Sequence, residues 1–412
     1  MKDVDGSRQR NASQSGGSQS WHIITSEYPP QSGGVSDYTR GVAAGLASRG
    51  DEVHVWCTGQ VPSEAEAAGV TVHRELGKIS PADLDRVGLQ LDRFPAPRRI
   101  LVQWVPHGYG YRSMNVAFCW WLRNRAVRSG DRVEIMVHEP YLPFGKGSPR
   151  QSAVAAVHRL MTMILLRAAE RVWMSIPHWE GTWRPYALGR RIPFQWLPIP
   201  SNIPVTHDPG RVADVRRRYA PDGRMLLGHF GTFGWPITSV LEPILIAQAR
   251  QPVRQTILLM GIGSEEYRDS LIRKNPQLAQ MIEATGPLTA KELSCHVAAC
   301  DLLIQPYPDG VSSRRTSVMI GLCHGKPIIS NIGPLSEPFW PETQALALAS
   351  LEHPDSYLSL LKQLTTDAGE RARMAAAARD LYQERFDISH TIEALRKPEC
   401  QSDRQSDRVC AS

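Results

Sequence analysis

Short apolar runs alternate along most of the chain with longer segments in which apolar residues recur at helical spacing. The short runs predict buried strands, and the longer segments predict helices that cover a sheet. In the first half of the chain we expect strands at 22–25, 52–57, 70–73, 100–104 and 133–137, and helices at 36–49, 114–128 and 153–171. Strands and helices that alternate in this way are typical of a parallel sheet with helices on both faces.

A proline-rich segment at 196–204 interrupts this alternation. Its three prolines in nine residues exclude a helix and favour extended chain. We therefore predict two α/β domains that face a shared cleft, at 21–200 and 201–385, followed by a C-terminal helix at 386–396. The polar tails at 1–20 and 397–412 are predicted to be disordered. In the second domain the same pattern predicts strands at 225–231, 255–263, 301–305 and 327–330, and helices at 290–299, 313–324 and 371–385.

Composition narrows the range of partners. The chain has 412 residues, 42% of them hydrophobic and 21% charged, with a formal net charge of +6. The basic residues are scattered and no nucleic-acid-binding motif appears, so we expect no nucleic acid partner. Anionic phosphates or an anionic membrane surface fit the charge, and so does a protein that is basic without any functional reason. Seven cysteines without a paired spacing indicate reduced thiols in a cytoplasmic protein.

The helix expected at 114–128 allows two interpretations. It carries Phe118, Trp120 and Trp121 beside Arg123 and Arg128. A helix packed on the sheet with a basic outer face is one interpretation, and a helix lying on a membrane surface is the other. The second would place the protein at the inner face of the membrane as a peripheral protein. The longest apolar run, at 160–166, is too short to cross a bilayer.

Two glycine- and serine-rich loops carry the clearest chemical signal. The first, at 28–38, contains Gly33 and Gly34, and the second, at 308–317, contains Arg314 and Arg315. Each loop connects a predicted strand to a predicted helix, which is where α/β domains bind phosphates and small polar ligands. An ordinary tight turn at the first loop and a solvated helix start at the second are the structural alternatives.

Three other patterns suggest chemistry only weakly. Asp83-Leu-Asp85 follows Ser80-Pro81, so it reads as the capped first turn of a helix rather than a metal site. The cluster of Cys295, His296 and Cys300 lacks the further ligand that a zinc site requires. Gly261-Ile-Gly263 lacks the third glycine and the later acidic residue of a dinucleotide-binding loop.

Taken in order, the motifs resemble those of the retaining glycosyltransferases of family 4, which have the GT-B fold of two Rossmann-like doubly wound domains facing a cleft. The resemblance covers residues 21 to about 396, and no single motif is decisive. The matching segments are Pro29-Pro30 with Gly33-Gly34, Leu46–Val53, Val137–Pro140, Leu197–Asn202, Gly286–Leu293, Ala299–Pro306 and Gly325–Ser330.

The chain departs from the family pattern in two places. Ser312 and Ile320 stand where the family has two glutamates, and the segment 231–238 lacks the usual Arg and Lys that hold the donor diphosphate. Arg314 and Arg315 are the natural substitutes, because guanidinium groups match phosphate oxygens and the two residues are expected to open the helix at 313–324.

The resemblance implies sugar transfer from a nucleotide diphosphate sugar to a carbohydrate or lipid-linked acceptor, with retention of the anomeric configuration. It implies no metal, and no cofactor besides the nucleotide sugar. Catalysis is expected from His138, Arg314 and Arg315, and the acceptor side from His107, Tyr109 and Glu139. The residues expected to contact the donor are Gly33, Gly34, Gly231, Thr232, Gly263, Gly286, Pro287, Leu288, Asp309, Ser312 and Ser313.

Two other functions remain open. The departures from the family pattern would also fit a GT-B protein that is a non-catalytic partner or binding subunit. A sugar-nucleotide epimerase on the same fold would need several acidic residues in the cleft, and the sequence does not show them. Hydrolysis of a nucleotide sugar distinguishes the transferase from the partner subunit.

Overall fold

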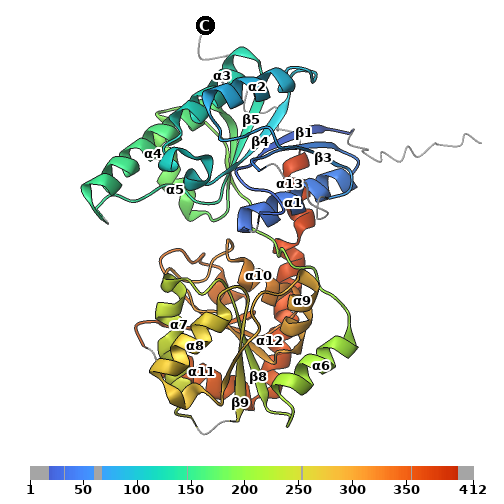
Figure 1. Ribbon diagram of the computed structural model, residues 1–412, viewed down its shortest axis with the longest axis vertical. Coiled ribbons are helices and arrows are strands. Elements are labelled where there is room, and N and C mark those ends of the chain that lie inside the picture. The colour runs from blue at the N-terminus through green and yellow to red at the C-terminus, as the bar shows by residue number, and fades with distance from the viewer. Residues whose placement is uncertain are drawn as a thin grey trace, which may run out of the picture.

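The computed structural model describes residues 18–31, 33–59, 67–145, 147–251, 254–353 and 355–397, which form two α/β domains one above the other (Figure 1). The tails predicted to be disordered lie outside the described residues except at their inner ends. There the prediction is wrong for residues 18–20. Ser18 Oγ donates a hydrogen bond to Gly50 O, and Ser20 begins the first strand.

The first domain is built on a parallel sheet of seven strands in the order β3-β2-β1-β4-β5-β6-β7. The strands are β1 (Ser20–Ile24), β2 (Glu52–Trp56), β3 (Val70–His73), β4 (Arg99–Trp104), β5 (Arg132–Val137), β6 (Ala169–Met174) and β7 (Phe194–Trp196). The helices are α1 (Gly34–Ser48), α2 (Pro81–Leu91), α3 (Val116–Arg128), α4 (Pro149–Ala168) and α5 (His178–Trp183). Ser80 caps α2 in a capping box with Asp83, as the sequence predicts.

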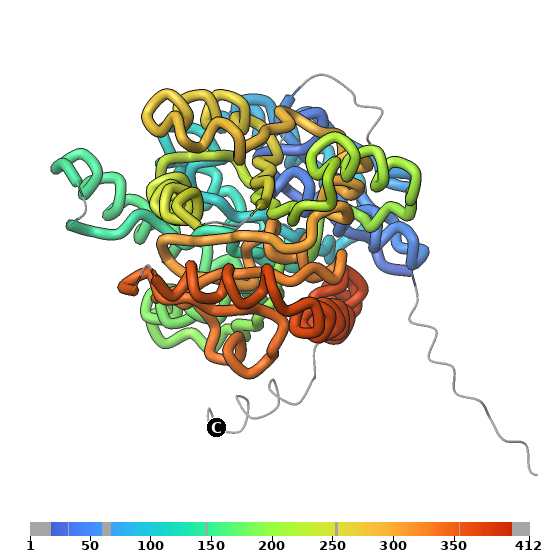
Figure 2. Tube along the Cα trace, turned by 90° about the horizontal axis from the view of Figure 1, so that it is seen from below, coloured from blue at the N-terminus to red at the C-terminus, as the bar shows by residue number. Residues whose placement is uncertain are grey.

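The second domain repeats this plan with six parallel strands in the order β10-β9-β8-β11-β12-β13. The strands are β8 (Met225–Phe230), β9 (Gln255–Met260), β10 (Ile282–Ala284), β11 (Leu302–Ile304), β12 (Ile328–Asn331) and β13 (Leu346–Ala349). The helices lie on both sides of this sheet (Figures 1 and 2). They are α6 (Pro209–Tyr219), α7 (Trp235–Gln248), α8 (Ser264–Lys274), α9 (Ala290–Ala299), α10 (Thr316–Cys323), α11 (Asp355–Thr366) and α12 (Ala368–Leu381).

The segment predicted as one helix at 153–171 is a helix followed directly by a strand. Helix α4 ends at Ala168, and Ala169 already has the extended backbone of β6, with ψ at 130°. Residues 169–174 then pair in parallel with β5 and β7. No glycine or proline marks this boundary, so the pairing with two neighbouring strands decides it against local helix propensity.

The end of the chain returns to the first domain. A π-helical turn at Tyr382–Phe386 leads to α13 (Ile388–Arg396), which lies beside α1 (Figure 1). Ile392 and Leu395 are buried against the α1 face of the first sheet. A Cβ at Gly45 would lie 2.6 Å from Ile392 Cδ1, so any larger residue at this position would force the Ile392 side chain to move.

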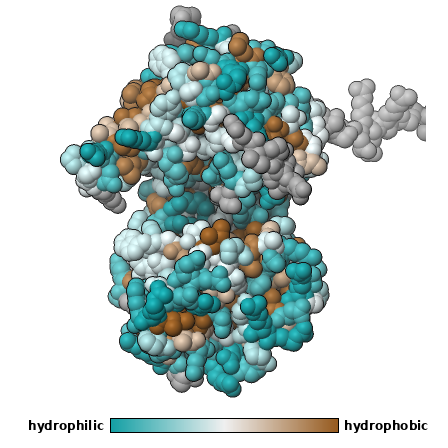
Figure 3. All heavy atoms as spheres, viewed as in Figure 1, coloured by the Kyte–Doolittle hydropathy of each residue, from teal (hydrophilic) through white to brown (hydrophobic). Residues whose placement is uncertain are grey.

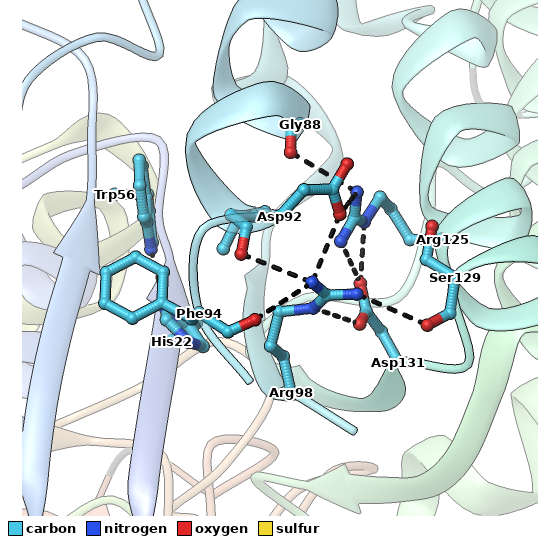
Figure 4. A network of polar contacts seen from close by, with 10 residues as sticks. His22, Trp56, Gly88, Asp92, Phe94, Arg98, Arg125, Ser129 and Asp131 are labelled. Carbon is cyan, nitrogen blue, oxygen red and sulfur yellow. Dashed lines mark hydrogen bonds and ion pairs between the residues drawn. The ribbon is translucent and has the colours of Figure 1, made fainter. Parts of the chain in front are cut away.

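A buried ion network joins the outer elements of the first domain (Figure 4). Asp131, with no exposed side-chain surface, accepts hydrogen bonds from Arg98 Nε and Arg125 Nε, each at 2.6 Å. Asp92 lies 3.2 Å from Arg98 and 2.9 Å from Arg125. The network therefore fixes α3 and the loop after α2 to the beginnings of β4 and β5.

Within the described residues, no helix has both the length and the apolar character needed to cross a bilayer. Helix α3 buries Phe118 and Leu122 and leaves Trp120 half exposed, so most of its aromatic face packs on the domain.

Candidate active site

The carboxyl ends of both sheets face the same cleft. Ser313 Oγ, in the loop after β11, donates a hydrogen bond to the carbonyl oxygen of Ser175, which follows β6 in the other domain, at 2.9 Å. Ile199 N donates to Ser313 O at 3.0 Å. The space-filling view shows the surface hollowed between the two domains (Figure 3). Because strands of α/β sheets bring their ligand-binding loops to this edge, the cleft is the candidate active site.

A crevice of about 610 Å³ extends along the connection between the domains. It is lined by Gly34 and Asp37 of α1, by Asn202 in the connecting segment and by Thr316 at the start of α10. Asn202 Nδ2 donates a hydrogen bond to Asp37 Oδ2 at 2.7 Å. Gly34 is exposed with no neighbour near its missing Cβ, so this turn of α1 is open to a ligand.

Arg314 and Arg315 lie together at the cleft, in front of α10. Both guanidiniums contact the carboxylate of Asp309, and both Nε atoms are buried without a hydrogen-bond partner. Burial, and then the charge of Arg315, lower the pKa of Arg314. The Arg314 guanidinium lies 5.7 Å from the ring centre of Trp179 in the other domain. The two cations share the carboxylate of Asp309, and the more distant carboxylate of Glu139 acts on Arg314 through its charge.

One expectation about this loop is wrong. The arginines do not open the helix, because Arg315 has an extended backbone and α10 begins at Thr316. Each carboxylate oxygen of Asp309 contacts one of the two arginines, so Asp309 sets the positions of both guanidiniums. Contact of Asp309 with the donor stays a prediction.

The two serines predicted for the donor are fully buried. Ser313 Oγ accepts a hydrogen bond from Trp196 Nε1 at 3.0 Å, and its backbone N–H donates to the carboxylate of Glu337. Ser313 is therefore part of the contact between the domains rather than an open ligand contact. Ser312 Oγ is buried without a partner.

Sequence reasoning missed Glu337, whose carboxylate holds the loop before the arginines. Its carboxylate accepts hydrogen bonds from Ser313 and from Trp340 Nε1, while burial raises its pKa. Glu337 lies 24 positions after Ser313, but nothing in its own neighbourhood, Ser336-Glu337-Pro338, indicates that partner.

The other predicted donor loops lie at the ends of β8, β9 and β10. Gly231 N–H donates to Met260 O, so among the described residues Thr232 offers the first unpaired amide of its loop. Gly263 has φ of 82° and precedes α8. Gly286 cannot offer its amide to a donor, because that N–H donates to Ser264 Oγ at 3.0 Å. Pro287 and Leu288 continue the Gly286 loop, with Pro287 exposed and Leu288 half-buried.

His138 follows β5, and its side chain lies between β4 and α1. Its Nε2 is 2.8 Å from Gln103 Oε1, and its ring meets Tyr38 of α1 edge to face at 4.9 Å between centroids. Burial lowers the pKa of His138 to about 4, so the imidazole is neutral near pH 7. A neutral ring with Nε2 engaged can still bind a sugar hydroxyl through Nδ1.

The three residues predicted for the acceptor side separate into two groups. His107 Nδ1 lies 3.4 Å from Glu139 Oε2 on the exposed rim of the cleft. The hydrogen bond between them raises the pKa of His107 and lowers that of Glu139. Tyr109 is fully buried, stacks on Trp104 and donates to Gln103 O at 2.7 Å. The Tyr109 ring is therefore turned away from the surface of the cleft, and its assignment to the acceptor side stays a prediction.

A second residue missed by sequence reasoning is His229 in β8. It is 1% exposed, its Nδ1 lies 2.7 Å from Ile304 O, and its Nε2 is buried without a partner. A Cβ at Gly231 would lie 3.3 Å from this Nε2, so the nitrogen faces the Gly231 loop. The sequence signal that could have indicated His229 is its place as the single polar side chain in the otherwise apolar strand β8.

No protein-family model and no curated protein matches this sequence. Solved structures do match it. Sucrose-phosphate synthase from Thermosynechococcus elongatus is 15% identical, with a TM-score of 0.67 over 96% of this chain and 100% of that chain. HepE from Anabaena, solved with UDP, is 16% identical, with a TM-score of 0.66 over 91% and 98%. WaaG, a glycosyltransferase of lipopolysaccharide biosynthesis, is 13% identical, with a TM-score of 0.61 over 92% and 98%.

These likenesses span nearly the whole chain and show its class of fold. The protein has the GT-B fold, in which two Rossmann-like domains face a cleft, and the prediction from sequence is confirmed. Membership of family 4 stays a prediction, as do the roles of the site residues.

Proposed function

We propose that the protein is a glycosyltransferase that moves a sugar from a nucleoside diphosphate sugar to an acceptor. The observation that carries this proposal is the arginine pair before α10, whose two guanidiniums share the single carboxylate of Asp309. Their paired positive charges and unpaired Nε atoms fit a diphosphate, which offers several oxygens to bidentate donors. HepE, which shares the fold, was solved with UDP and with UDP-glucose.

In the proposed reaction, the bond between the anomeric carbon and the phosphate oxygen breaks while the acceptor oxygen bonds to the same carbon. Negative charge grows on the departing phosphate, and Arg314, Arg315 and the amide of Thr232 stabilise it. The acceptor proton passes to that phosphate. His138 binds a hydroxyl of the transferred sugar through Nδ1, because its low pKa makes it a weak base near pH 7.

The finer features of the proposal follow the family resemblance. The anomeric configuration is retained, no metal takes part, and no cofactor is needed besides the nucleotide sugar. The acceptor is a carbohydrate or a lipid-linked carbohydrate, with His107 and Glu139 on its side of the cleft. The exposed Trp120, with Arg123 4.8 Å from its ring centre, supports peripheral membrane contact if the acceptor is carried on a lipid.

Calorimetric titration with UDP, GDP and ADP in EDTA tests the proposal, followed by hydrolysis of matching nucleotide sugars. We expect one nucleotide to bind, and Arg314→Met or Arg315→Met to weaken it roughly tenfold or more, since each removes a charge-assisted contact. Arg217→Met is the matched control, because Arg217 is an exposed arginine that also pairs with an aspartate. The anomer of the product, read by NMR, tests retention.

If no nucleotide binds, the partner-subunit alternative replaces the proposal. If a nucleotide binds but no nucleotide sugar is ever turned over, the protein is a binding subunit. Equal affinity in the wild type and both arginine variants would show that the diphosphate is held elsewhere.

A further inference from the structure

A second cationic pocket lies at the opposite edge of the first sheet, where the strands begin. It has a volume of about 320 Å³ and is lined by Ser20, Arg99, Arg132, Arg171 and Lys397, among others. The candidate active site lies at the carboxyl ends of the same strands, so the length of a strand, roughly 20 Å, separates the two. This pocket therefore cannot be an extension of the donor site.

The strand register places three arginines on one face of the sheet. Arg99 of β4 is aligned with Arg132 of β5, and Glu134 of β5 is aligned with Arg171 of β6. Side chains two residues apart on a strand point to the same face, so Arg132 and Glu134 share that face with Arg99 and Arg171. Three neighbouring strands thus direct guanidiniums to the same surface.

Two of these arginines are already satisfied. Arg99 Nε donates to Glu134 Oε1 at 2.7 Å, and its other nitrogens donate to Gln19 Oε1 and Leu395 O. Arg132 binds Glu170 through two nitrogens, at 2.8 and 3.1 Å.

Arg171 is different. Its residue is 6% exposed, its Nε is buried without a partner, and no hydrogen bond or ion pair of its side chain occurs among the described residues. The Arg171 guanidinium lies 5.0 Å from the centre of the Trp173 ring. The aligned Glu134 does not neutralise it, because that carboxylate binds Arg99 and Trp173 Nε1 instead. A buried guanidinium nitrogen without an acceptor is costly, so a ligand that brings oxygens into this pocket would be stabilised.

We propose that this pocket binds a phosphate-class oxyanion, held by Arg171 and completed by Lys397 at its rim. Guanidinium groups bind phosphate well because they offer paired N–H donors that match two of its oxygens. The ligand is either a free phosphate compound or the phosphate of a lipid headgroup, since both present the same chemistry. The Trp173 ring supports the guanidinium from the side and leaves its N–H groups for the anion.

The test compares Arg171→Met with Arg167→Met. Arg167 is an exposed arginine near the same edge, so both variants remove one positive charge, and the comparison does not depend on whether the cleft also binds phosphate. Inorganic phosphate is titrated into each full-length protein by calorimetry, and melting is recorded in phosphate and in chloride at equal ionic strength. We expect Arg171→Met to bind phosphate at least about tenfold more weakly than the wild type, and Arg167→Met to bind it as the wild type does.

The melting data give an independent readout. Phosphate should raise the melting temperature of the wild type and of Arg167→Met but not that of Arg171→Met, as linkage of binding to folding requires. In chloride, Arg171→Met should melt at or above the wild-type temperature, because it removes an uncompensated buried charge. If that variant does not fold, Lys397→Met, at the exposed rim, replaces it and should also weaken phosphate binding.

Vesicles distinguish the two sources of the anion. Co-sedimentation of the wild type, but not of Arg171→Met, with phosphatidylcholine vesicles that contain phosphatidic acid would identify a lipid headgroup. Phosphate binding without co-sedimentation would identify a free phosphate compound. Equal phosphate affinity in Arg171→Met and the wild type, or a loss of stability in chloride with an unchanged response to phosphate, would overturn the proposal.

Discussion

Replacing Asp131 by asparagine should be among the most destabilising single changes in the first domain. The carboxylate has no exposed surface and lies 2.6 Å from Arg98 Nε and 2.6 Å from Arg125 Nε and Nη2. Both arginine side chains are only 6% exposed. Asparagine keeps the shape but loses the charge, and its amide N–H₂ would face a guanidinium donor.

The expected cost is about 3–5 kcal/mol, the range for breaking a buried ion pair by neutralising one partner. Asp92, half exposed and within 3.2 Å of both arginines, limits the loss because it remains as a counter-charge. For a domain of this size, the melting temperature should fall by roughly 10 °C.

Tryptophan fluorescence during urea unfolding is the assay. Nine of the eleven tryptophans precede residue 200, so the signal reports mainly on the first domain. The control is Asp214→Asn, which breaks an exposed pair with Arg217 and should leave the urea midpoint unchanged. A midpoint for Asp131→Asn that corresponds to less than about 1 kcal/mol of destabilisation would refute the idea that this network holds the domain together.

Two further predictions concern histidines. His138→Ala should keep nucleotide affinity and lower turnover by roughly ten- to a thousandfold, about 1.4 to 4 kcal/mol, and His138→Gln should recover part of it if the ring binds a sugar hydroxyl. A destabilised His138→Ala with full turnover, measured beside its melting temperature, would remove this residue from the site. Burial lowers the pKa of His22 to about 3. In the unfolded chain the imidazole of His22 takes up a proton near its ordinary pKa of about 6.5, whereas in the folded protein it stays neutral down to about pH 3. Protonation of the unfolded chain should therefore lower the free energy of unfolding as the pH falls through this range, by up to about 1.4 kcal/mol per pH unit. His22→Asn, which keeps an acceptor for Trp56 Nε1, should flatten the dependence of the urea midpoint on pH; an unchanged slope would contradict this.

Periodicity predicted most strands and helices, because burial in a parallel sheet leaves a strong apolar signal. Periodicity failed where pairing with neighbouring strands, rather than the local sequence, determines the structure. The boundary between α4 and β6 falls inside Leu166-Arg-Ala-Ala-Glu-Arg171, which favours helix throughout, and pairing with β5 and β7 overrides it. Strand β7 has three residues and lies before a proline-rich segment, so it was not expected.

The candidate site was predicted in outline and not in detail. The sequence indicates which loops reach the cleft, because the loops that follow the carboxyl ends of parallel strands lie at the same edge of the sheet. It does not indicate that Asp309 binds both Arg314 and Arg315, since that depends on the extended backbone before α10. Tyr109 shows the same limit: its position after β4 suggested the rim, while its ring turns inward onto Trp104.

The return of α13 to the first domain has a consequence for synthesis on the ribosome. Ile392 and Leu395 belong to the same buried cluster as Val42 and Leu46 of α1, although some 350 residues separate the two helices. The first domain, though made first, cannot bury this face until the last helix has left the exit tunnel. The second domain has all of its strands earlier, but its core includes Tyr382 and Phe386 just before α13. We therefore expect the first domain to finish folding together with the second rather than before it, in contrast to the usual order of domain folding during translation.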